Sequence, residues 1–268
     1  MLPHLFELGR FALPTYGVLA AAGLILGLLL NVHLARRDGI NEDKAWNLGV
    51  IVILAAILGG KLMLLVTEPQ YSLTNWRNIF TFSFVQSGGV YYGGLLGAFA
   101  AAVIYLRMAK LPGLRTADAF APGVAFGHGI GRLGCLAAGC CYGSLTDMPW
   151  GVIFTNPLAE KQAGTPLGIP LHPTQVYEFL AEMVITSILL LLWRKKTFAG
   201  QVIGTYLFLY GIARFFIEFY RGDPGRGSVF GGMFSLTQVI SIGFVIAGGI
   251  LWLRRRPATM APAPATAS

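Results

Sequence analysis

Seven apolar runs, each close to the length of a membrane-spanning helix, restrict what this sequence can fold into. A helix needs roughly 20 mainly apolar residues to cross the hydrocarbon core of a bilayer. The runs cover about residues 14–34, 45–66, 88–106, 117–138, 172–193, 200–219 and 235–253. The fourth run is the weakest, because several glycines, His128 and Arg132 interrupt it. The sequence therefore predicts an all-α integral membrane protein, a seven-transmembrane helical bundle.

The composition agrees with a membrane protein. Hydrophobic residues make up 55% of the 268 residues and charged residues only 12%, with a mean hydropathy of +0.64. Such a chain is too apolar for a soluble domain. No Pro- or Ser-rich linker divides residues 1–256, so we expect one domain there, followed by a low-complexity, disordered cytoplasmic tail over residues 257–268. Residues 1–11 lack the basic start and the small-residue cleavage pattern of a removable signal peptide.

Basic residues follow every odd-numbered run, which predicts the orientation of the bundle. Short cytoplasmic loops of membrane proteins collect Lys and Arg. The clusters are Arg36, Arg37 and Lys44; Arg107, Lys110 and Arg115; Arg194, Lys195 and Lys196; and Arg254, Arg255 and Arg256. We therefore expect an extracytoplasmic N-terminus and a cytoplasmic C-terminus. The same placement explains the net charge of +8, so we expect no binding of nucleic acid.

Arginines at the outer ends of the fourth and sixth runs are the first candidates for a functional site. A charge at membrane depth costs at least a few kcal/mol on insertion scales, which makes Arg132 a functional candidate. Arg214, Glu218 and Arg221 are spaced i, i+4, i+7 and should share one helical face. Because guanidinium groups bind phosphate through paired hydrogen bonds, these arginines could hold an anionic lipid head group. Alternatively, Arg214 and Glu218 form an internal salt bridge, and Arg221 snorkels to the interface.

Other polar side chains and glycines fall at the same outer level. Tyr16 begins the first run, and Tyr92, Gly93 and Gly94 begin the third. Several spans thus deliver polar groups to one depth, which suggests a single cavity open to the exterior. Glycine lets a lipid head group approach the backbone and permits unwound segments at a cavity. Taken alone, the glycine pairs favour close helix packing through small residues.

The start of the fifth run has two interpretations. His172, with Gln175, Tyr177 and Glu178, places further polar groups at the outer level of the cavity. Alternatively, residues 172–178 form an N-terminal helix cap with an aromatic-belt residue. Taken alone, this segment favours the structural interpretation.

All three cysteines, Cys135, Cys140 and Cys141, follow Arg132 closely. Outside the cytoplasm two of them could form a disulfide, most simply Cys135 with Cys140 or Cys141. They could also act in redox chemistry, or bind a soft metal, although three cysteines without a well-spaced histidine are a poor zinc pattern. Free cysteines also pack as small hydrophobic side chains. Packing or a structural disulfide is the favoured interpretation, so we predict no metal.

Four sequence blocks together resemble the prolipoprotein diacylglyceryl transferase family. They are Gly131–Gly134 with Gly139 and Gly143, the Gly-Gly-Val-Tyr-Tyr-Gly-Gly segment at 88–94, His172–Glu178, and Arg214–Arg221. The resemblance covers roughly residues 16–253. It implies a bacterial inner-membrane protein with seven spans and a small extracytoplasmic head formed by loops, and no metal or organic cofactor.

The same resemblance implies an activity. Enzymes of this family transfer diacylglycerol from phosphatidylglycerol to the lipobox cysteine thiol of preprolipoproteins, forming a thioether and releasing glycerol 1-phosphate. Arg132 resembles the arginine that binds the lipid phosphate, Arg214 resembles a second essential arginine, and Tyr16 resembles the first-span tyrosine. The expected catalytic residues are Arg132, Arg214, Glu218, Tyr16 and Tyr92, and the expected substrate-binding residues are Arg132, Arg221, Gly93, Gly94, Gly143 and His172. The expected partners are phosphatidylglycerol, membrane lipid and the signal peptides of preprolipoproteins.

The chain departs from the family pattern at polar positions close to Arg132. Cys135 and Ala138 stand where asparagines are usual, Cys140 stands where glutamate is usual, and Tyr92 stands where a histidine often precedes the Gly-Gly pair. These changes leave open which group accepts the proton, and whether a divergent enzyme handles another thiol or lipid. A channel or transporter is a further alternative, because polar groups and broken helices also line permeation paths.

Overall fold

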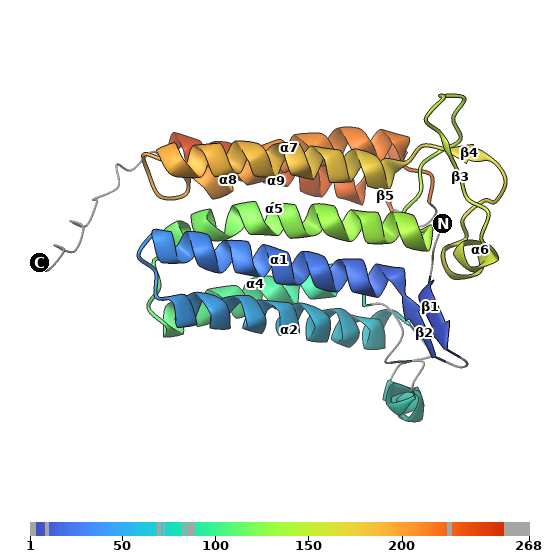
Figure 1. The fold of residues 1–268 in the computed structure, drawn as a ribbon, viewed down its shortest axis with the longest axis horizontal. Coiled ribbons are helices and arrows are strands. Elements are labelled where there is room, and N and C mark those ends of the chain that lie inside the picture. Colours follow the sequence, from blue (N-terminus) through green and yellow to red (C-terminus); the bar gives the residue numbers. More distant parts are fainter. Residues whose placement is uncertain are drawn as a thin grey trace, which may run out of the picture. The chain divides into compact units, whose positions relative to one another are not determined.

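The seven apolar runs form seven long helices in the part of the chain that the structure describes. The computed structural model describes residues 4–8, 11–68, 71, 73–81, 84, 89–223 and 227–254. The long helices are α1 (Thr15–Arg37), α2 (Glu42–Thr67), α4 (Tyr91–Met108), α5 (Gly113–Ala138), α7 (Thr174–Lys195), α8 (Gln201–Ile217) and α9 (Leu236–Leu253) (Figure 1). Each helix begins and ends within a few residues of its predicted run. The hydropathy pattern therefore placed the helices correctly.

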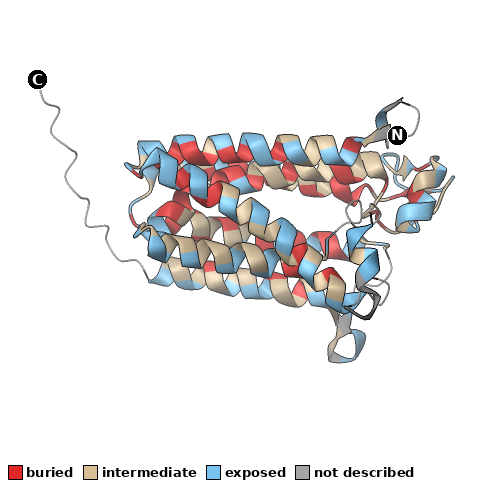
Figure 2. Ribbon diagram, turned by 90° about the horizontal axis from the view of Figure 1, so that it is seen from below, coloured by how far each residue is buried: buried red, intermediate tan, exposed pale blue. Residues whose placement is uncertain are grey.

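Length and apolarity mark most of these helices as membrane spans. Among the described residues, α1, α2, α7, α9 and the stretch Gln201–Tyr220 are long and apolar enough to cross a bilayer, and α4 is a shorter apolar helix. The helices expose large apolar side chains, such as Leu58 on α2 and Leu191 on α7. Figure 2 shows buried and exposed residues on different faces of the same helix. Apolar faces of this kind are covered by lipid in a multi-pass membrane protein.

The chain divides into two compact units, one of residues 1–31 and 117–268 and the other of residues 32–116. In the first unit, α1 and α5 approach closely through paired glycines. A Cβ atom added at Gly23 would lie 2.6 Å from the Gly127 carbonyl oxygen, and one at Gly27 would lie 2.5 Å from the Gly123 oxygen. The small-residue packing interpretation of this glycine-rich stretch is confirmed. The unwinding alternative is wrong here, because α5 is helical from Gly113 to Ala138.

The rest of the first unit packs around α8, which contacts both α7 and α9. A buried cluster joins α5, α7 and α8: Ala121, Ala125, Ile185, Leu189, Val202, Tyr206 and Tyr210. Asp118 of α5 accepts hydrogen bonds from the backbone N–H groups of Gly200, Val202 and Ile203, at 2.7, 2.9 and 2.9 Å. The first backbone donors of a helix have no partner within the helix, so this carboxylate caps α8 from a neighbouring helix.

The second unit is built on α2 and α4, which also pack through glycine. A Cβ atom added at Gly97 would lie 2.6 Å from the Ala55 oxygen, and one at Gly59 would meet the Gly93 oxygen. The Val90 backbone N–H donates to the Gly60 oxygen at 3.1 Å. The predicted glycine pair therefore lies in a helix–helix contact. A short 3₁₀ helix, η2 (Leu73–Phe80), follows α2 in the same unit.

Short elements that the sequence analysis did not predict connect the helices. β1 (His4–Leu8) and β2 (Phe11–Pro14) form a hairpin before α1. Between α5 and α7, β3 (Val152–Ile153) pairs with β4 (Pro170–Leu171) beside α6 (Pro157–Ala163), over a small core of Tyr142, Phe154 and Leu171. Between α8 and α9 lie η3 (Glu218–Tyr220), β5 (Ser228–Val229), η4 (Phe230–Gly232) and β6 (Phe234–Ser235). These pieces are too short to leave a hydropathy signal.

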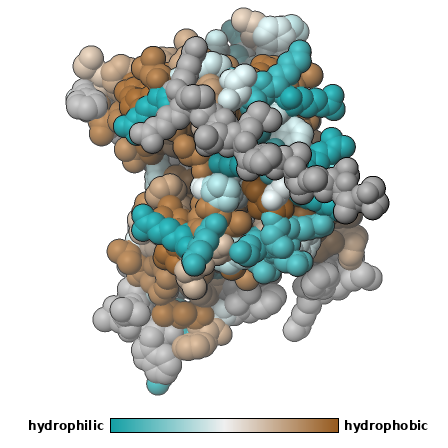
Figure 3. Space-filling model, turned by 90° about the vertical axis from the view of Figure 1, so that its left-hand side faces the viewer, coloured by the Kyte–Doolittle hydropathy of each residue, from teal (hydrophilic) through white to brown (hydrophobic). Residues whose placement is uncertain are grey.

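Within each unit, the predicted basic loops gather at one end of the helices. In the second unit, Arg115 donates to the Asp38 carbonyl oxygen at 2.5 Å and Lys44 donates to the Ala109 oxygen at 3.0 Å. In the first unit, Phe198 packs edge-on against Trp252. This contact brings the α7–α8 turn, which follows Lys195 and Lys196, to the end of α9 before Arg254. Figure 3 shows hydrophilic side chains beside hydrophobic helix flanks on one face. Arg255, Arg256, Gly88 and the predicted tail over residues 257–268 lie outside the described residues.

Candidate active site

Two helices of the first unit supply the polar face of the candidate site. His128, Arg132 and Cys135 follow one another along one side of α5 at helical spacing. Glu178 and Glu182 do the same on α7, and both are buried. The two faces meet, because His128 and Arg132 each contact a carboxylate of α7.

Glu178 joins the two arginines that the sequence singled out. Its Oε1 lies 2.9 Å from Nη2 of Arg132, and its Oε2 lies 3.9 Å from Nη1 of Arg214. The Glu178 side chain is only 2% exposed, whereas the Arg132 and Arg214 side chains are 16% and 9% exposed. The structure thus brings Arg132 of α5 and Arg214 of α8 to one carboxylate on α7, as the prediction of one shared chamber requires.

Arg214 has a second carboxylate partner at the end of its own helix. Its Nη2 lies 3.0 Å from Oε2 of Glu218, which begins η3. The Ser235 hydroxyl at the start of α9 donates to Oε1 of Glu218 at 2.8 Å. The predicted salt bridge is therefore confirmed. This salt bridge is not the only ion pair of Arg214, because the same guanidinium group also contacts Glu178.

His128, Glu182 and Tyr210 complete this network, and the sequence analysis did not select them. Nδ1 of His128 lies 2.5 Å from Oε1 of Glu182, and its Nε2 lies 3.6 Å from Oε1 of Glu178. The Tyr210 hydroxyl donates to Glu178 at 3.5 Å, and its ring meets the His128 ring edge-on. The spacing of His128 to Arg132 and of Glu178 to Glu182, each i, i+4, was the signal that could have identified them.

Two guanidinium donors in this network lack a hydrogen-bond partner among the described residues. They are Nε of Arg132 and Nη1 of Arg214, and both atoms are buried. Buried donors are nearly always satisfied, because leaving one without a partner costs about 1–3 kcal/mol or more for a charged group. Two such donors beside one carboxylate form an arrangement that an incoming phosphate can complete.

Arg221 lies outside the predicted helical row. α8 ends at Ile217, so Arg221 follows η3 and does not continue the face of Arg214. Nε and Nη2 of Arg221 donate to the two carboxylate oxygens of Asp223 at 2.8 and 2.7 Å. Burial opposes the charge, but the hydrogen bonds and charge of Asp223, together with the nearby Cys141 sulfur, more than offset it and raise the pKa of Arg221. The snorkelling interpretation is wrong, since the side chain is 3% exposed.

Gly143 and His172 connect the segment after α5, the start of α7 and the segment after η3 through backbone contacts. Gly143 pairs with Arg221 in an isolated β-bridge, and its N–H donates to the His172 oxygen at 3.0 Å. A Cβ atom at Gly143 would lie 2.7 Å from the Tyr220 oxygen, so this position has no room for a side chain. The His172 ring bonds the Tyr177 hydroxyl at 3.0 Å. The segment does begin a helix, as the cap interpretation predicts: α7 starts at Thr174 with Pro173 as its N-cap residue, which makes no side-chain cap hydrogen bond. Substrate binding by Gly143 and His172 stays a prediction.

Tyr16 lies beside the same end of α5. It is 46% exposed, and a Cβ atom added at Gly134 would lie 3.2 Å from Cδ2 of its ring. Tyr16 is also within electrostatic range of Arg132 and the cysteines that follow it. The structure therefore places Tyr16 next to the arginine-bearing helix, and its catalytic role stays a prediction.

Tyr92, Gly93 and Gly94 belong to the second unit. Gly93 packs against Gly59, and a Cβ atom added at Gly94 would lie 3.1 Å from the Ala56 oxygen. These contacts give the two glycines a packing role within the unit. A catalytic role for Tyr92 and substrate binding by the glycines stay predictions.

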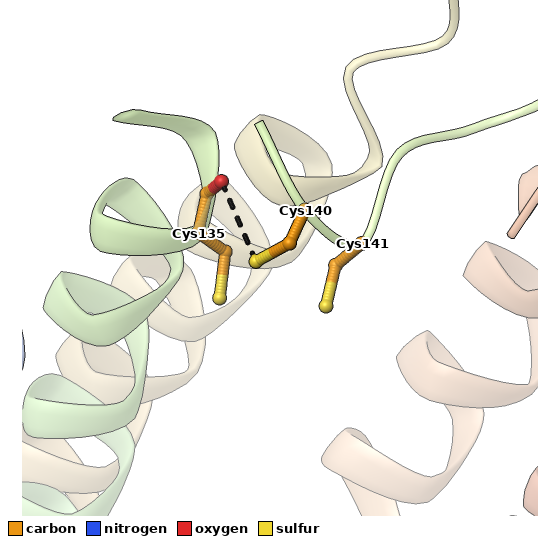
Figure 4. A group of neighbouring side chains, drawn as sticks. All are labelled: Cys135, Cys140 and Cys141. Carbon is orange, nitrogen blue, oxygen red and sulfur yellow. Dashed lines mark hydrogen bonds between the residues drawn. The ribbon is translucent and has the colours of Figure 1, made fainter. Parts of the chain in front are cut away.

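The three cysteines lie together where α5 ends (Figure 4). All three are free, so neither predicted disulfide is formed. Their Sγ atoms lie within 4.8 Å of one another. Among the described residues, this is the group of side chains that could hold a metal ion.

Comparison with known proteins points to one family. The model of the family described as prolipoprotein diacylglyceryl transferase matches residues 3–254. A phosphatidylglycerol–prolipoprotein diacylglyceryl transferase of Clostridium tetani is 36% identical over 249 residues, which cover 92% of this chain and 95% of that protein. Phosphatidylglycerol–prolipoprotein diacylglyceryl transferase 2 of Clostridium perfringens is 37% identical over 237 residues, which cover 88% of each chain. The enzyme of Geobacter sulfurreducens is 33% identical over 251 residues, covering 92% of each chain.

Proposed function

Because this chain belongs to the prolipoprotein diacylglyceryl transferase family, we propose that it transfers diacylglycerol from phosphatidylglycerol to the lipobox cysteine thiol of preprolipoproteins. The protein is a membrane transferase of lipoprotein biosynthesis, and its substrates are phosphatidylglycerol and preprolipoproteins with their signal peptides. One observation supports this proposal above the others. Arg132 and Arg214 share Glu178, and each keeps a buried donor that has no hydrogen-bond partner among the described residues.

The reaction forms one C–S bond and breaks one C–O bond. The thiol gives up its proton to a base or to solvent, and the sulfur attacks the diacylglycerol carbon that carries the phosphate. The phosphate oxygen leaves with the head-group glycerol as glycerol 1-phosphate. Since a phosphodiester becomes a phosphomonoester, negative charge grows on the phosphate as the bond breaks. A site lowers this barrier by directing fixed positive charge at that phosphate.

Arg132 and Arg214 supply this charge in our proposal. Their unsatisfied donors, Nε of Arg132 and Nη1 of Arg214, are the atoms that would bind the phosphate oxygens. Because the two groups come from different helices and are already held by Glu178, little reorganisation is needed when charge develops. Removing one such contact commonly lowers the rate about 100- to 1,000-fold.

The acidic neighbours act as positioning residues. Glu178 holds both guanidinium groups, and Glu218, itself held by Ser235, fixes the other edge of Arg214. His128 lies between Glu178 and Glu182 and keeps Glu178 beneath the arginines. A carboxylate that is itself hydrogen-bonded holds its guanidinium partner in one geometry.

The remaining predicted residues keep their proposed roles. We propose that Tyr16 and Tyr92 donate hydrogen bonds or assist thiol deprotonation. We further propose that Arg221, Gly93, Gly94, Gly143 and His172 contribute to the substrate-binding surface. For Tyr16, the support is its place beside the Arg132 helix. For Arg221, the support is its bridge to Gly143.

In the membrane, we propose seven spans with an extracytoplasmic N-terminus and a cytoplasmic C-terminus. α4 and α5 would join the five more apolar helices, with the charge of Arg132 paired with Glu178 inside the protein. The gathering of basic loops at one end within each unit supports this orientation. The segment between α5 and α7 would form the small extracytoplasmic head, and the bacterial inner membrane would be the location.

The transporter alternative loses its support. Broken helices were part of the case for it, and α5 is unbroken. The relatives named above are transferases, and this chain matches them over nearly their whole length. The remaining alternative is a divergent enzyme that uses another thiol or lipid.

The test is a transferase assay with purified protein, phosphatidylglycerol and a lipobox peptide, read by mass spectrometry of the diacylglyceryl adduct. We expect the wild type to form the adduct, and Arg132→Ala and Arg214→Ala to lose about 100-fold or more of the rate. Arg194→Ala, an exposed arginine in the last turn of α7, is the matched control. Full activity of either site variant would refute the assigned roles. Absence of the adduct with the wild type, together with failure to support a transferase-depleted cell, would favour another substrate.

A further inference from the structure

We propose that Cys135, Cys140 and Cys141 form a three-thiolate site for a soft metal ion such as Zn²⁺ or Cu⁺. Cys135 is the buried member, in the last turn of α5, and the other two follow in the turn after the helix. All three Sγ atoms lie within 4.8 Å of one another, and none is in a disulfide. Figure 4 shows the three side chains directed to the same region.

The backbone of this turn is arranged so that the sulfurs converge. Gly139 has φ of 78° and reverses the chain after α5, and the Cys140 N–H donates to the Cys135 oxygen at 3.1 Å. Cys141 has φ of 62°, which is unusual for a residue with a side chain and costs free energy. Packing of a thiol as a small hydrophobic side chain does not require such a backbone. In this conformation the three sulfurs lie close together.

Buried side chains hold the turn in this conformation. Thr165 donates to the Gly139 oxygen at 2.6 Å, Gln175 donates to the Cys140 oxygen at 2.7 Å, and Thr174 donates to the Cys141 oxygen at 2.8 Å. The exposed fractions of these three residues are 0%, 1% and 0%. Three consecutive carbonyl groups are therefore fixed from outside the turn. The hydrogen bonds around a metal site orient its ligands in the same manner.

The spacing of the sulfurs suits a metal centre. With metal–sulfur distances of about 2.3 Å and tetrahedral angles, ligand sulfurs lie about 3.8 Å apart. The cysteines need only small side-chain adjustments to reach this spacing from within 4.8 Å. Thiolates prefer Zn²⁺ and Cu⁺ over harder cations. On binding, three thiol protons leave to the solvent as three metal–sulfur bonds form.

The surroundings can balance the charge of such a centre. Three thiolates and one Zn²⁺ carry a net charge of −1. Arg132, one helical turn before Cys135, and Arg221, which interacts with the Cys141 sulfur, both lie close to the cluster. Three protein ligands leave a fourth position for water or another ligand, as in open zinc sites. This inference depends on the cysteines and not on the transferase activity.

The test uses full-length protein in detergent, purified without chelator and reduced under anaerobic conditions. Zn²⁺ is added and excess removed by gel filtration, after which metal and protein are quantified. A parallel sample receives Cu⁺. A third receives Co²⁺, whose thiolate charge-transfer bands report sulfur ligation directly and do not require any variant. Cys140→Ser and Cys141→Ser test the ligands, and Met148→Leu, an exposed sulfur residue in the following loop, is the matched control.

We expect one Zn²⁺ or Cu⁺ per chain in the wild type and in Met148→Leu, protection of all three thiols from alkylation by the bound metal, and thiolate bands with Co²⁺. Each Cys→Ser variant should bind at least about tenfold more weakly. Fully reduced protein that retains no metal and shows three freely alkylated thiols would overturn the proposal. So would metal retention that is unchanged in both serine variants.

Discussion

Arg132 and Arg214 bind the two oxygens of the same buried carboxylate, Glu178, although they lie on different helices. Nε of Arg132 and Nη1 of Arg214 are buried and have no hydrogen-bond partner among the described residues, although Nη1 lies 3.9 Å from Oε2 of Glu178. We propose that this pair binds phosphate, and the predictions below test its contacts and the packing of its helices.

Glu178→Gln should remove the shared counter-charge while keeping the size of the side chain. Removing one partner of a buried ion pair costs about 3–5 kcal/mol, because the remaining charges stay buried. We expect a lower thermal unfolding temperature and at least about a 100-fold loss of transferase rate. Glu160→Gln, an exposed change in α6, should leave both measurements unchanged. A fully active Glu178→Gln enzyme would show that the arginines do not depend on this carboxylate.

Ser235→Ala should weaken two contacts at once. The Ser235 hydroxyl donates to Glu218 and also accepts from the Gln238 N–H in the capping box of α9. Loss of a helix cap costs about 1 kcal/mol, so the unfolding temperature should fall slightly. Activity should fall by about three- to tenfold, because Arg214 loses part of its positioning. Ser235→Thr keeps the hydroxyl and should restore both values, and failure of this rescue would argue against the hydrogen-bond explanation.

Gly27→Ala should disrupt the contact between α1 and α5. Its Cβ atom would lie 2.5 Å from the Gly123 carbonyl oxygen, closer than the two backbones allow. We expect a loss of about 1–3 kcal/mol, typical of overpacking, measured by thermal unfolding in detergent. Gly17→Ala on the same helix meets no atom within 4 Å and is the control. Equal stability of both variants would contradict the close helix packing.

Asp118→Ala should destabilise the start of α8. The carboxylate satisfies three backbone N–H groups there, and all of them would lose their acceptor. Since an unsatisfied buried donor costs about 1–3 kcal/mol, we expect one of the larger stability losses of any single change in the first unit. Asp147→Asn, on an exposed loop residue, should have no measurable effect. Hydrogen exchange at Val202 and Ile203 would locate the damage.

The sequence determined the positions of the helices. Five helices have the length and apolar character that a bilayer imposes on a span, and both properties are local, so hydropathy placed the seven long helices within a few residues. The glycine pairs indicated close helix packing, because residues without side chains let two helices approach. The short hairpins were not predicted, because two-residue strands have no periodicity to detect.

The candidate site was only partly predictable. Arg132, Arg214 and Glu218 stood out because a charge inside an apolar run is costly unless it is used. Arg221 was misplaced, since α8 ends at Ile217 and helical spacing does not continue beyond it. His128 and Glu182 were missed. Their i, i+4 spacing to Arg132 and Glu178 indicates a shared face within each helix, but it does not indicate which side chain of the other helix lies opposite.

Tertiary structure alone decided which side chains meet. Contacts between α5, α7 and α8 depend on the rotation and register of each helix, and packing across the bundle sets these properties. The sharing of Glu178 by two arginines follows from that packing. The three sulfurs converge across the turn at Gly139, which Thr174 and Gln175 of α7 hold in place. Hydropathy therefore specifies the spans from the sequence, whereas the chemistry of the site depends on contacts between residues distant in the chain.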